Sequence, residues 1–309
     1  MKTYLMNGMY RSLVQFTNAH FPVLLAKLRF RKLFGRNLNL KNPQDLNEKI
    51  LWLSLFSDTS EWSRLADKYA VRQYVEEKGL GHILLKLYGK WDKVEDIDWD
   101  SLPKSFVLKT NNGSGTVLIV KDKNKIDIGE TKLLLNEWLI KRPSCDTTEF
   151  HYNKIIPCII AEELLVQPNK ETYISETLID YKIWCFNGKS YIIRTYGNRV
   201  EGSTEIATFD KEWNDHPEVS VFNDHYRACK ILPSRPKRLQ EMLLIAETLS
   251  EGFPEVRVDL YYVNDKIYFG ELTFTSQGAC MNNFTPEFLF EMGKHVDLRG
   301  IKKEKRYRK

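Results

Sequence analysis

Two acidic residues near the C-terminus, Asp259 and Glu271, have the type and spacing of a pair that holds a metal ion. They stand in two strand-like segments on either side of a short turn. If residues 264–266 form the connection, the alternation of side chains along the strands places Asp259 opposite Glu271. The same register pairs Arg257 with Thr273. The other face is then nearly all apolar, and its residues are Val256, Val258, Leu260, Tyr262, Tyr268, Gly270 and Leu272.

The apolar face decides between this register and its alternative. A two-residue turn would put Asp259 and Glu271 on opposite faces, and one carboxylate would then lie among apolar side chains at a high cost. Two carboxylates that face each other repel unless a cation lies between them. Oxygen ligands of this kind suit Mg²⁺, which also binds substrate phosphates. We therefore predict a Mg²⁺ site, in preference to a structural pair that Arg257 neutralises.

A glycine-rich loop is the second candidate for chemistry. Lys109 ends a strand-like segment, and Gly113 and Gly115 follow within six residues. Glycines let backbone N–H groups approach phosphate oxygens closely, and Lys109 would add a positive charge. The loop is not a Walker A motif, because no Lys-Ser or Lys-Thr pair opens a helix after it, and it is not a Rossmann turn, because a strand follows. By itself the pattern fits a phosphate-binding loop and a plain hairpin turn equally well.

Cysteine chemistry is not indicated. The count is odd and no two cysteines have the CxxC spacing, so neither a disulfide framework nor a zinc site is predicted, and a reducing compartment is favoured. A lone nucleophile among them stays open, but buried filler is the favoured role. The five residues are Cys145, Cys158, Cys185, Cys229 and Cys280.

Helical patterns alternate with the strands that must position these residues. Apolar spacing and capping signals predict the helices, one of which has Asn42-Pro43 at its first turn. Strands are predicted from short β-rich runs, and Asn187-Gly188 is a strong hairpin signal. The expected helices cover residues 21–34, 42–56, 62–78, 130–141 and 238–249. The expected strands lie in residues 105–109, 117–120, 155–166, 179–196, 256–263 and 267–274.

The order of these elements resembles the ATP-grasp superfamily, and more narrowly the TupA-like ATP-grasp family of surface-polysaccharide and teichuronopeptide biosynthesis. Six modest motifs in the right order carry the resemblance, which spans roughly residues 25–295. They are Asn42-Pro43 with Asn47-Glu48-Lys49, the segment 65–72, the segment 106–115, Ala161-Glu162-Glu163-Leu164, the segment 180–188, and the pair of segments 257–261 and 269–274.

The resemblance implies an α+β chain with the ATP-grasp fold, in which two α+β subdomains clasp ATP behind a helical N-terminal region. The implied division is residues 1–65 for the helical region, 66–165 for the N-terminal or lid subdomain, 166–299 for the C-terminal subdomain with the metal site, and 300–309 for a basic tail.

The resemblance also assigns nucleotide-binding residues. Lys68 and Lys109 would hold the phosphates of ATP, and the loop after Lys109 would close over them. A hinge would meet adenine through backbone groups and a carboxylate. The loop residues are Thr110, Asn111, Gly113, Ser114 and Gly115, and the hinge residues are Glu162, Glu163 and Leu164.

The remaining implied roles concern the metal and the transferred phosphoryl group. Asp259 and Glu271 would hold Mg²⁺. Many ATP-grasp enzymes have Asn as the third ligand, and this chain has Thr273, whose hydroxyl is a poorer ligand. The γ-phosphate or an acyl phosphate would be bound by Lys182, Arg194 and Arg257.

The reaction that the resemblance implies is the formation of an amide bond. ATP phosphorylates a carboxylate, an amine attacks the acyl phosphate, and ADP and phosphate leave, with catalysis by positioning and charge neutralisation. The implied partners are a sugar or uronic-acid polysaccharide precursor and an amino acid. The reverse polarity, with an amino-acid carboxylate and an amino sugar, stays open.

Other enzyme classes remain as alternatives. An ATP-grasp fold also supports a kinase that phosphorylates a sugar hydroxyl. A glycosyltransferase would use Asp96-Ile97-Asp98 as a DxD metal motif, but no apolar strand leads into this tripeptide, so a solvated loop is the favoured interpretation. A non-catalytic scaffold is disfavoured because basic residues and carboxylates stand at each expected nucleotide position.

Composition and charge limit the partners. The chain has 309 residues, 28% of them charged, and a formal net charge of +5. This charge suits anionic partners such as nucleotides, and the sequence contains no nucleic-acid-binding signature. No signal peptide or membrane span is indicated, and a cytoplasmic location is expected. The basic helix at 21–34 packs on the protein or docks on an anionic membrane, and we favour packing because charge runs are weak indicators. Docking of this helix and of the basic tail 302–309 on the inner leaflet is a hypothesis.

Overall fold

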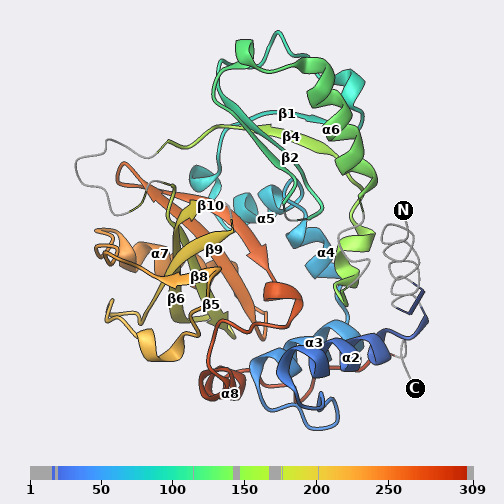
Figure 1. The fold of residues 1–309 in the computed structure, drawn as a ribbon, viewed down its shortest axis with the longest axis vertical. Coiled ribbons are helices and arrows are strands. Elements are labelled where there is room, and N and C mark those ends of the chain that lie inside the picture. Colours follow the sequence, from blue (N-terminus) through green and yellow to red (C-terminus); the bar gives the residue numbers. More distant parts are fainter. Residues whose placement is uncertain are drawn as a thin grey trace.

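A computed structural model shows a base of helices beneath two sheets (Figure 1). It describes residues 16–17, 20–113, 115–141, 147–166, 175, 177–200 and 202–304. The helices are α2 (Pro22–Phe34), α3 (Leu46–Phe56), α4 (Ser60–Ala66), α5 (Val71–Glu77), α6 (Ile128–Ile140), α7 (Leu239–Leu249) and α8 (Pro286–Lys294). The strands are β1 (Leu87–Trp91), β2 (Phe106–Thr110), β3 (Val117–Val120), β4 (Ile159–Glu162), β5 (Asp180–Phe186), β6 (Lys189–Val200), β7 (Ser203–Phe209), β8 (Tyr226–Ala228), β9 (Val256–Val263) and β10 (Lys266–Thr273).

The first sheet, which we call the lid sheet, has the strand order β1-β4-β2-β3 and is antiparallel throughout. Its sequence alternates strictly in β2, where Phe106 and Leu108 are fully buried and Val107 and Lys109 are not. The buried side chains pack with Leu135 of α6 in a core of their own. Helix α6 therefore covers one face of the lid sheet and leaves the face of Lys109 open.

The second sheet, which we call the core sheet, has the order β10-β9-β5-β6-β7-β8, with only the β7–β8 pair parallel. Every residue of β5 is buried, as expected for a central strand covered on both faces. Helices α3, α7 and α8 contribute to the large core beside it. The arrangement confirms the predicted α+β class, with mixed helices and antiparallel sheets.

The hairpin of β9 and β10 has the predicted pairing but not the predicted turn. Its connection is the two residues Asn264 and Asp265, both with positive φ, the conformation of a tight hairpin turn. The register then shifts by one residue between Phe269 and Glu271, and this bulge restores the pairing of Glu271 with Asp259. The expectation of a three-residue turn was wrong, because a bulge can supply the extra residue further along the strand.

The bulge also changes which side chains form the apolar face. Before it, Phe269 pairs with Leu260 and Tyr268 pairs with Tyr261, so Phe269 is buried and Tyr268 lies on the carboxylate side. Tyr268 and Gly270 were therefore wrongly placed on the apolar face. Gly270 itself passes so close to β9 that a Cβ atom would lie 2.9 Å from the carbonyl oxygen of Asp259.

The predicted helix at 62–78 is two helices, α4 and α5, separated at residues 67–70. Asp67 causes the break, because its carboxylate accepts hydrogen bonds from the backbone N–H groups of Tyr69 and Ala70 at 2.8 and 3.1 Å. Such local bonds compete with a continuous helix. The break frees the backbone N–H of Lys68, which donates to the carbonyl oxygen of Asn111 at 3.1 Å.

Two further boundaries differ from the predictions. Asn42-Pro43 does not begin a helix; α3 begins at Leu46, and Asp45 caps it by accepting a hydrogen bond from the N–H of Glu48. The strand expected at 155–166 is limited to β4. The first boundary differs because Asp45, and not Asn42-Pro43, provides the N-cap.

Glu255, just before β9, is a buried acid without a hydrogen-bond partner for either carboxyl oxygen among the described residues. It has no exposed surface. Burial raises the pKa of Glu255 well above its usual value. A group with a raised folded-state pKa stabilises the fold below its unfolded pKa, about 4.3, and that contribution is lost as the pH rises toward the folded pKa.

We expect the substitution Glu255→Gln to raise the free energy of unfolding by about 1 kcal/mol or more at pH 8 and by less at pH 5. The amide cannot ionise in the unfolded chain, so the penalty disappears. Urea denaturation at the two pH values measures the difference, and Glu212→Gln at an exposed position is the control. A gap between wild type and variant that does not grow with pH would contradict the assignment.

Candidate functional site

The open face of the lid sheet combines a buried ion pair with exposed apolar side chains. Lys109 pairs with Val117 across β2 and β3, and Val107 pairs with Ile119, so the four side chains share a face. Val117 and Ile119 are 47% and 56% exposed. Lone exposed apolar residues are ordinary, but two beside a partly buried lysine fit the wall of a site for a flat apolar group. Sequence reasoning missed both.

Glu162 at the end of β4 is the counter-ion of Lys109. Its carboxylate lies 2.5 Å from Lys109 Nζ and 3.2 Å from Arg72, and it is almost fully buried. Arg72 also donates to the carbonyl oxygen of Leu85 at 2.8 Å, so the pair is anchored on both sides. Sequence reasoning missed Arg72 in this role.

The predicted hinge continues from β4. The backbone N–H of Glu163 donates to the carbonyl oxygen of Lys86 at 2.9 Å. Glu163 and Leu164 are partly exposed, which leaves backbone groups of this segment available to a ligand.

Two residues of the glycine-rich loop, Thr110 and Asn111, make hydrogen bonds within the protein. Thr110 and Asn111 are buried. Thr110 Oγ1 lies 2.6 Å from Thr116 Oγ1, and the amide of Asn111 bonds to the carbonyl of Ile156 and the N–H of Cys158. These bonds fix both ends of the loop. The prediction for Ser114 lies outside the described residues.

Lys68 joins the two sheets. Its ammonium donates to the carbonyl oxygen of Gly113 and lies 3.9 Å from Glu271 Oε2. Burial lowers the pKa of Lys68, and the carboxylate of Glu271 opposes that shift. The helix break at Asp67 places the side chain there. The structure thus places Lys68 beside Glu271 and within electrostatic range of Lys109; their contact with a nucleotide stays a prediction.

A charged cluster covers the adjacent face of the core sheet; we call it the central cluster, and its members are Asp180, Lys182, Arg257, Asp259 and Glu271. Arg257 donates hydrogen bonds from Nε and Nη2 to the carboxylate of Asp259 at 2.6 and 2.7 Å. Lys182 forms a second ion pair with Asp259. Lys182 also lies 2.8 Å from Asp180. Every member except Glu271 is buried.

The order of strands explains the cluster. Lys182 of β5 pairs with Asp259 of β9, and Asp259 pairs with Glu271 of β10, so their side chains share one face. Asp180 lies two residues before Lys182 on β5, and Arg199 forms an ion pair with it at 2.6 Å. Burial alone raises the pKa of Asp180, but Lys182 and Arg199 outweigh it and the net shift is downward. Sequence reasoning missed Asp180 and Arg199.

Glu271 is the carboxylate that remains accessible. Its side chain is 37% exposed, and its Oε1 accepts from Arg257 at 3.3 Å and from the Thr273 hydroxyl at 3.0 Å. Burial opposes ionisation, but Lys68, Lys182 and Arg257 lower the pKa of Glu271 to about 2. Glu271 is therefore ionised throughout the physiological pH range.

The two predicted metal ligands differ in how well they fit Mg²⁺. Glu271 fits, because Oε2 faces the open side next to Lys68. Both oxygens of Asp259 are held by cations, and Arg257 lies between the two carboxylates. Among the residues described, no group of three or more His, Cys, Asp or Glu side chains is placed to hold a metal ion. Glu271 could hold Mg²⁺ together with substrate phosphates, whereas Asp259 would first have to release a cation.

Arg194 pairs with Lys182 across β5 and β6, but its guanidinium bonds to residues outside the central cluster. It is fully buried, and its guanidinium donates to Thr208 Oγ1, the carbonyl of Asn283 and Ser220 Oγ at 2.8 to 3.1 Å. All three acceptors are neutral, and burial lowers the pKa of Arg194 to about 10. In this arrangement Arg194 ties residues 220 and 283 to the core sheet instead of facing a phosphate. Its predicted phosphate contact would require these bonds to open.

The candidate DxD motif lies away from the cluster. Asp96 ends a short 3-10 turn, and Asp98 accepts hydrogen bonds from the N–H groups of Asp100 and Ser101. Ile97 is buried in the core under the lid sheet. The segment is a capped surface loop, as the favoured interpretation held.

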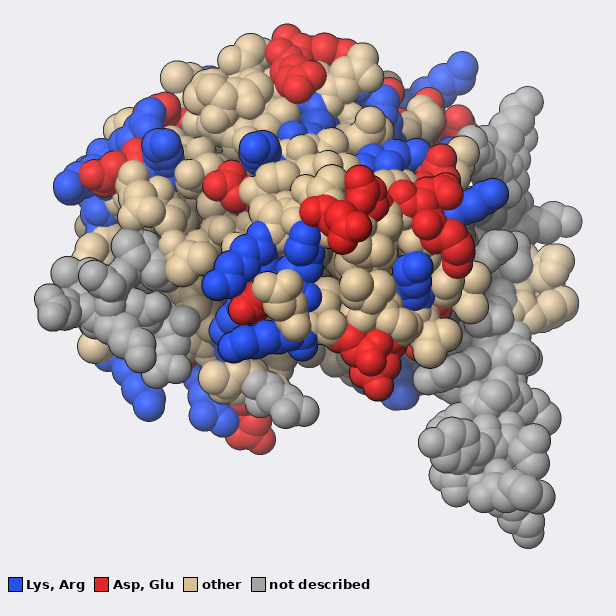
Figure 2. Space-filling model, turned by 90° about the horizontal axis from the view of Figure 1, so that it is seen from above, with Lys and Arg blue, Asp and Glu red and all other residues tan. Residues whose placement is uncertain are grey.

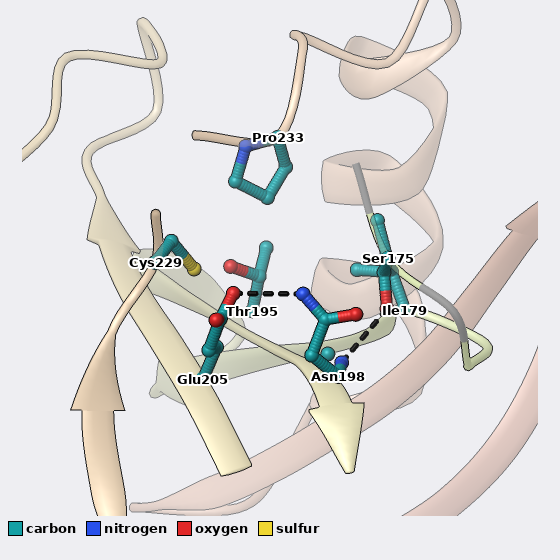
Figure 3. A pocket seen from close by; sticks show the side chains of 8 residues that line it. Ser175, Ile179, Thr195, Asn198, Glu205, Cys229 and Pro233 are labelled. Atoms are coloured by element: carbon teal, nitrogen blue, oxygen red, sulfur yellow. Dashed lines mark hydrogen bonds between the residues drawn. The ribbon is translucent and has the colours of Figure 1, made fainter. Parts of the chain in front are cut away.

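A small pocket lies on the core sheet (Figure 3), and none of its lining residues belongs to the central cluster. It measures about 200 Å³, its opening included. The Asn198 amide donates to Glu205 at 2.8 Å, and the Asn198 N–H donates to Ser175 Oγ at 2.8 Å. Because Thr195 is next to Arg194 on β6, it faces away from Lys182. The lining residues are Ser175, Ile179, Thr195, Gly197, Asn198, Glu205, Cys229 and Pro233.

The charge on the upper face of the molecule does not favour one class of macromolecular partner. Figure 2, a view onto the lid sheet from above, shows Lys and Arg side chains interleaved with Asp and Glu. A continuous basic surface would indicate a polyanion, and this face carries none among the described residues. The expectation of no nucleic-acid partner stays a prediction.

Among the comparisons with known proteins, the match in sequence is more informative than the matches in structure. A family profile described as TupA-like ATPgrasp matches residues 48–296. None of the curated proteins matches. D-alanine–D-alanine ligase from Bacillus anthracis complexed with ATP is 15% identical with a TM-score of 0.39, over 71% of this chain and 57% of the ligase.

Two other solved structures are similarly remote. A second structure of D-alanine–D-alanine ligase from Bacillus anthracis is 18% identical, with a TM-score of 0.44 over 78% of this chain and 67% of that one. D-alanyl-alanine synthetase A from Vibrio cholerae is 12% identical, with a TM-score of 0.44 over 81% and 68%. The chain thus spans little more than half of the first ligase and about two thirds of the others.

Proposed function

Because the chain belongs to the TupA-like ATP-grasp family, we propose that it is an ATP-dependent ligase that joins a carboxylate to an amine. The observation that best supports the proposal is the position of Lys68. It bonds to Gly113 of the lid loop and lies 3.9 Å from Glu271 of the core sheet. One cation thereby lies between a glycine-rich loop and an ionised carboxylate, an arrangement that suits the phosphates of a nucleoside triphosphate.

The proposed nucleotide site uses both sheets. Lys109 and Lys68 hold the phosphates of ATP, and Glu162 keeps Lys109 extended along the open face. Val117 and Ile119 contact the base, with the backbone of residues 163–164 at its edge. Residues 110, 111 and 113–115 shape the loop that covers the phosphates. In this proposal the lid subdomain is 66–165 and the C-terminal subdomain is 166–299.

The proposed chemistry is carried by charge neutralisation. Glu271, assisted by Thr273, is the residue that would hold Mg²⁺, which when bound would neutralise phosphate charge. Asp259 keeps Lys182 and Arg257 pointing at the place where the phosphoryl group leaves ATP. These two cations then stabilise the charge on the acyl phosphate until an amine displaces phosphate. Arg194 holds the surrounding segments in position.

The proposed substrates are a uronic-acid carboxylate of a polysaccharide precursor and an amino acid, in the cytoplasm where ATP is available. The family assignment supports this choice. A screen of uronic acids against amino acids, with ADP and phosphate both measured, tests it. Equal release of ADP and phosphate supports the ligase, and ADP release without phosphate would indicate a sugar kinase instead. Reversed pairs, with amino sugars and amino-acid carboxylates, test the other polarity.

A further inference from the structure

The outer face of α2 exposes apolar side chains. On the inner face of the helix Leu25 is buried, and Ala26 and Phe30 belong to the large core. Phe21, Leu24 and Leu28 nevertheless point outward and are 54%, 49% and 57% exposed. Their spacing of three and four residues gathers them in one stripe. A surface helix normally presents polar residues on this side.

Within α2, the charged residues that border the stripe are all positive. Lys27, Arg31 and Lys32 are exposed, and α2 contains no acidic residue. At 3.6 residues per turn, Lys27 and Arg31 lie on one side of the stripe and Lys32 on the other. The fourth basic residue, Arg29, turns inward and donates to the carbonyls of Gln277 and Gly278 at 3.5 and 3.3 Å. It fixes the rotation of the helix, so the outer face is a fixed surface.

We propose that this face of α2, consisting of Phe21, Leu24, Lys27, Leu28, Arg31 and Lys32, docks the protein on the surface of an anionic lipid bilayer. An apolar stripe flanked by Lys and Arg is the pattern that inserts between headgroups while the charges meet anionic lipid. No helix of the described part of the chain has the length and apolarity to cross a membrane, so the contact is interfacial. The helix also packs on the protein, as the charge run alone favoured, because Ala26 and Phe30 lie in the core; the docking proposal concerns only its outer face. This proposal is independent of the ligase reaction.

A matched control lies on α6. Leu133 and Ile140 are 74% and 80% exposed, more than any residue of the α2 stripe. Glu130 and Glu137 share their face of the helix. If apolar exposure alone caused membrane binding, α6 would bind at least as well as α2. If basic flanks are needed, α6 contributes nothing.

The test is flotation of the full chain with vesicles of phosphatidylcholine alone or mixed with phosphatidylglycerol. We expect wild type to float only with the anionic vesicles, and less at high salt. The double variant Leu24→Glu/Leu28→Glu should bind at least about tenfold more weakly. Lys27→Ser/Arg31→Ser/Lys32→Ser should lose about fivefold in affinity per charge. Leu133→Glu/Ile140→Glu should float like wild type.

Folding and association are checked on the same samples. Circular dichroism confirms that each variant is folded, because the changed side chains point outward. The proposal is overturned if wild type does not float with anionic vesicles, or if the α2 and α6 variants behave alike. Size-exclusion chromatography that shows a dimer lost in the α2 variants would assign the face to a second copy and would also overturn it. ADP formation from soluble substrates should be unchanged in the α2 variants, so a failure here leaves the ligase proposal intact.

Discussion

Replacing Arg257 by methionine is expected to abolish ADP formation and to lower the free energy of unfolding by about 3–5 kcal/mol. Arg257 donates to both oxygens of Asp259, to Glu271, to Thr273 and to Ser276. The side chain of Asp259 is only 2% exposed, and without Arg257 it keeps a single cationic partner, Lys182. Removing one partner from a buried pair leaves an uncompensated charge, which is the costly case.

The conservative variant separates stability from catalysis. Arg257→Lys keeps the positive charge but loses the two-pronged contact, so we expect partial recovery of stability without recovery of turnover. Urea denaturation and an ADP assay measure the two effects. Arg238→Met is the matched control. Arg238 donates from Nε and Nη2 to Glu241, both at 2.6 Å, and the pair is exposed. An exposed ion pair contributes less than about 1 kcal/mol. If Arg257→Met lost no more free energy of unfolding than this control, the central cluster would not stabilise the fold as predicted.

Lys109→Ala is expected to reduce ADP formation by about 10²–10³-fold or more. Lys109 is the cation at the end of β2, and a positioned charge on the phosphates is lost with it. The fold should survive, because Glu162 keeps Arg72 as a partner at 3.2 Å. Turnover is measured with whichever carboxylate and amine release ADP in the substrate screen.

The control for this variant lies on the same subdomain. Lys104 precedes β2 and its side chain is 75% exposed, with Asp122 at 3.9 Å. Lys104→Ala should therefore turn over like wild type. An unchanged rate of ADP release in Lys109→Ala would refute the assignment of Lys109.

Much of the site could be predicted because it follows from patterns along strands. Alternation and the cost of burying a carboxylate placed Asp259 opposite Glu271 and Arg257 opposite Thr273, and both pairings are confirmed. The turn was wrong, since a three-residue loop and a two-residue loop with a bulge give the same pairing. Gly270, which allows the bulge, looks in the sequence like any small residue of a strand.

The parts that could not be predicted depend on contacts distant in sequence. Asp180 and Arg199 form an ion pair only because β6 returns alongside β5. The break after α4 is a local exception, because Asp67 accepts hydrogen bonds from the N–H groups of Tyr69 and Ala70 in place of continuing the helix. Arg194 has the composition of a phosphate ligand, yet burial and three neutral acceptors engage it fully. Family resemblance assigns a position to such a residue, but it does not determine which way the side chain points.

The Mg²⁺ prediction illustrates the same limit. The sequence favoured a metal between Asp259 and Glu271 over neutralisation by Arg257. In the structure Arg257 bonds to both carboxylates, and the part of the pair that remains open is Glu271 Oε2. The side-chain length of Arg257, which lets it reach across two strands, decides this and is not visible in strand alternation.

Calorimetric titration of Mg-ATP into wild type and Lys109→Ala is the most direct measurement of the central claim, that ATP binds between the lid sheet and the core sheet. We predict clear binding by wild type and by Lys104→Ala, no measurable binding by Lys109→Ala, and weaker binding by wild type when Mg²⁺ is removed with a chelator. A folded wild type that does not bind Mg-ATP, or a Lys109→Ala variant that binds it as tightly as wild type, would contradict the claim.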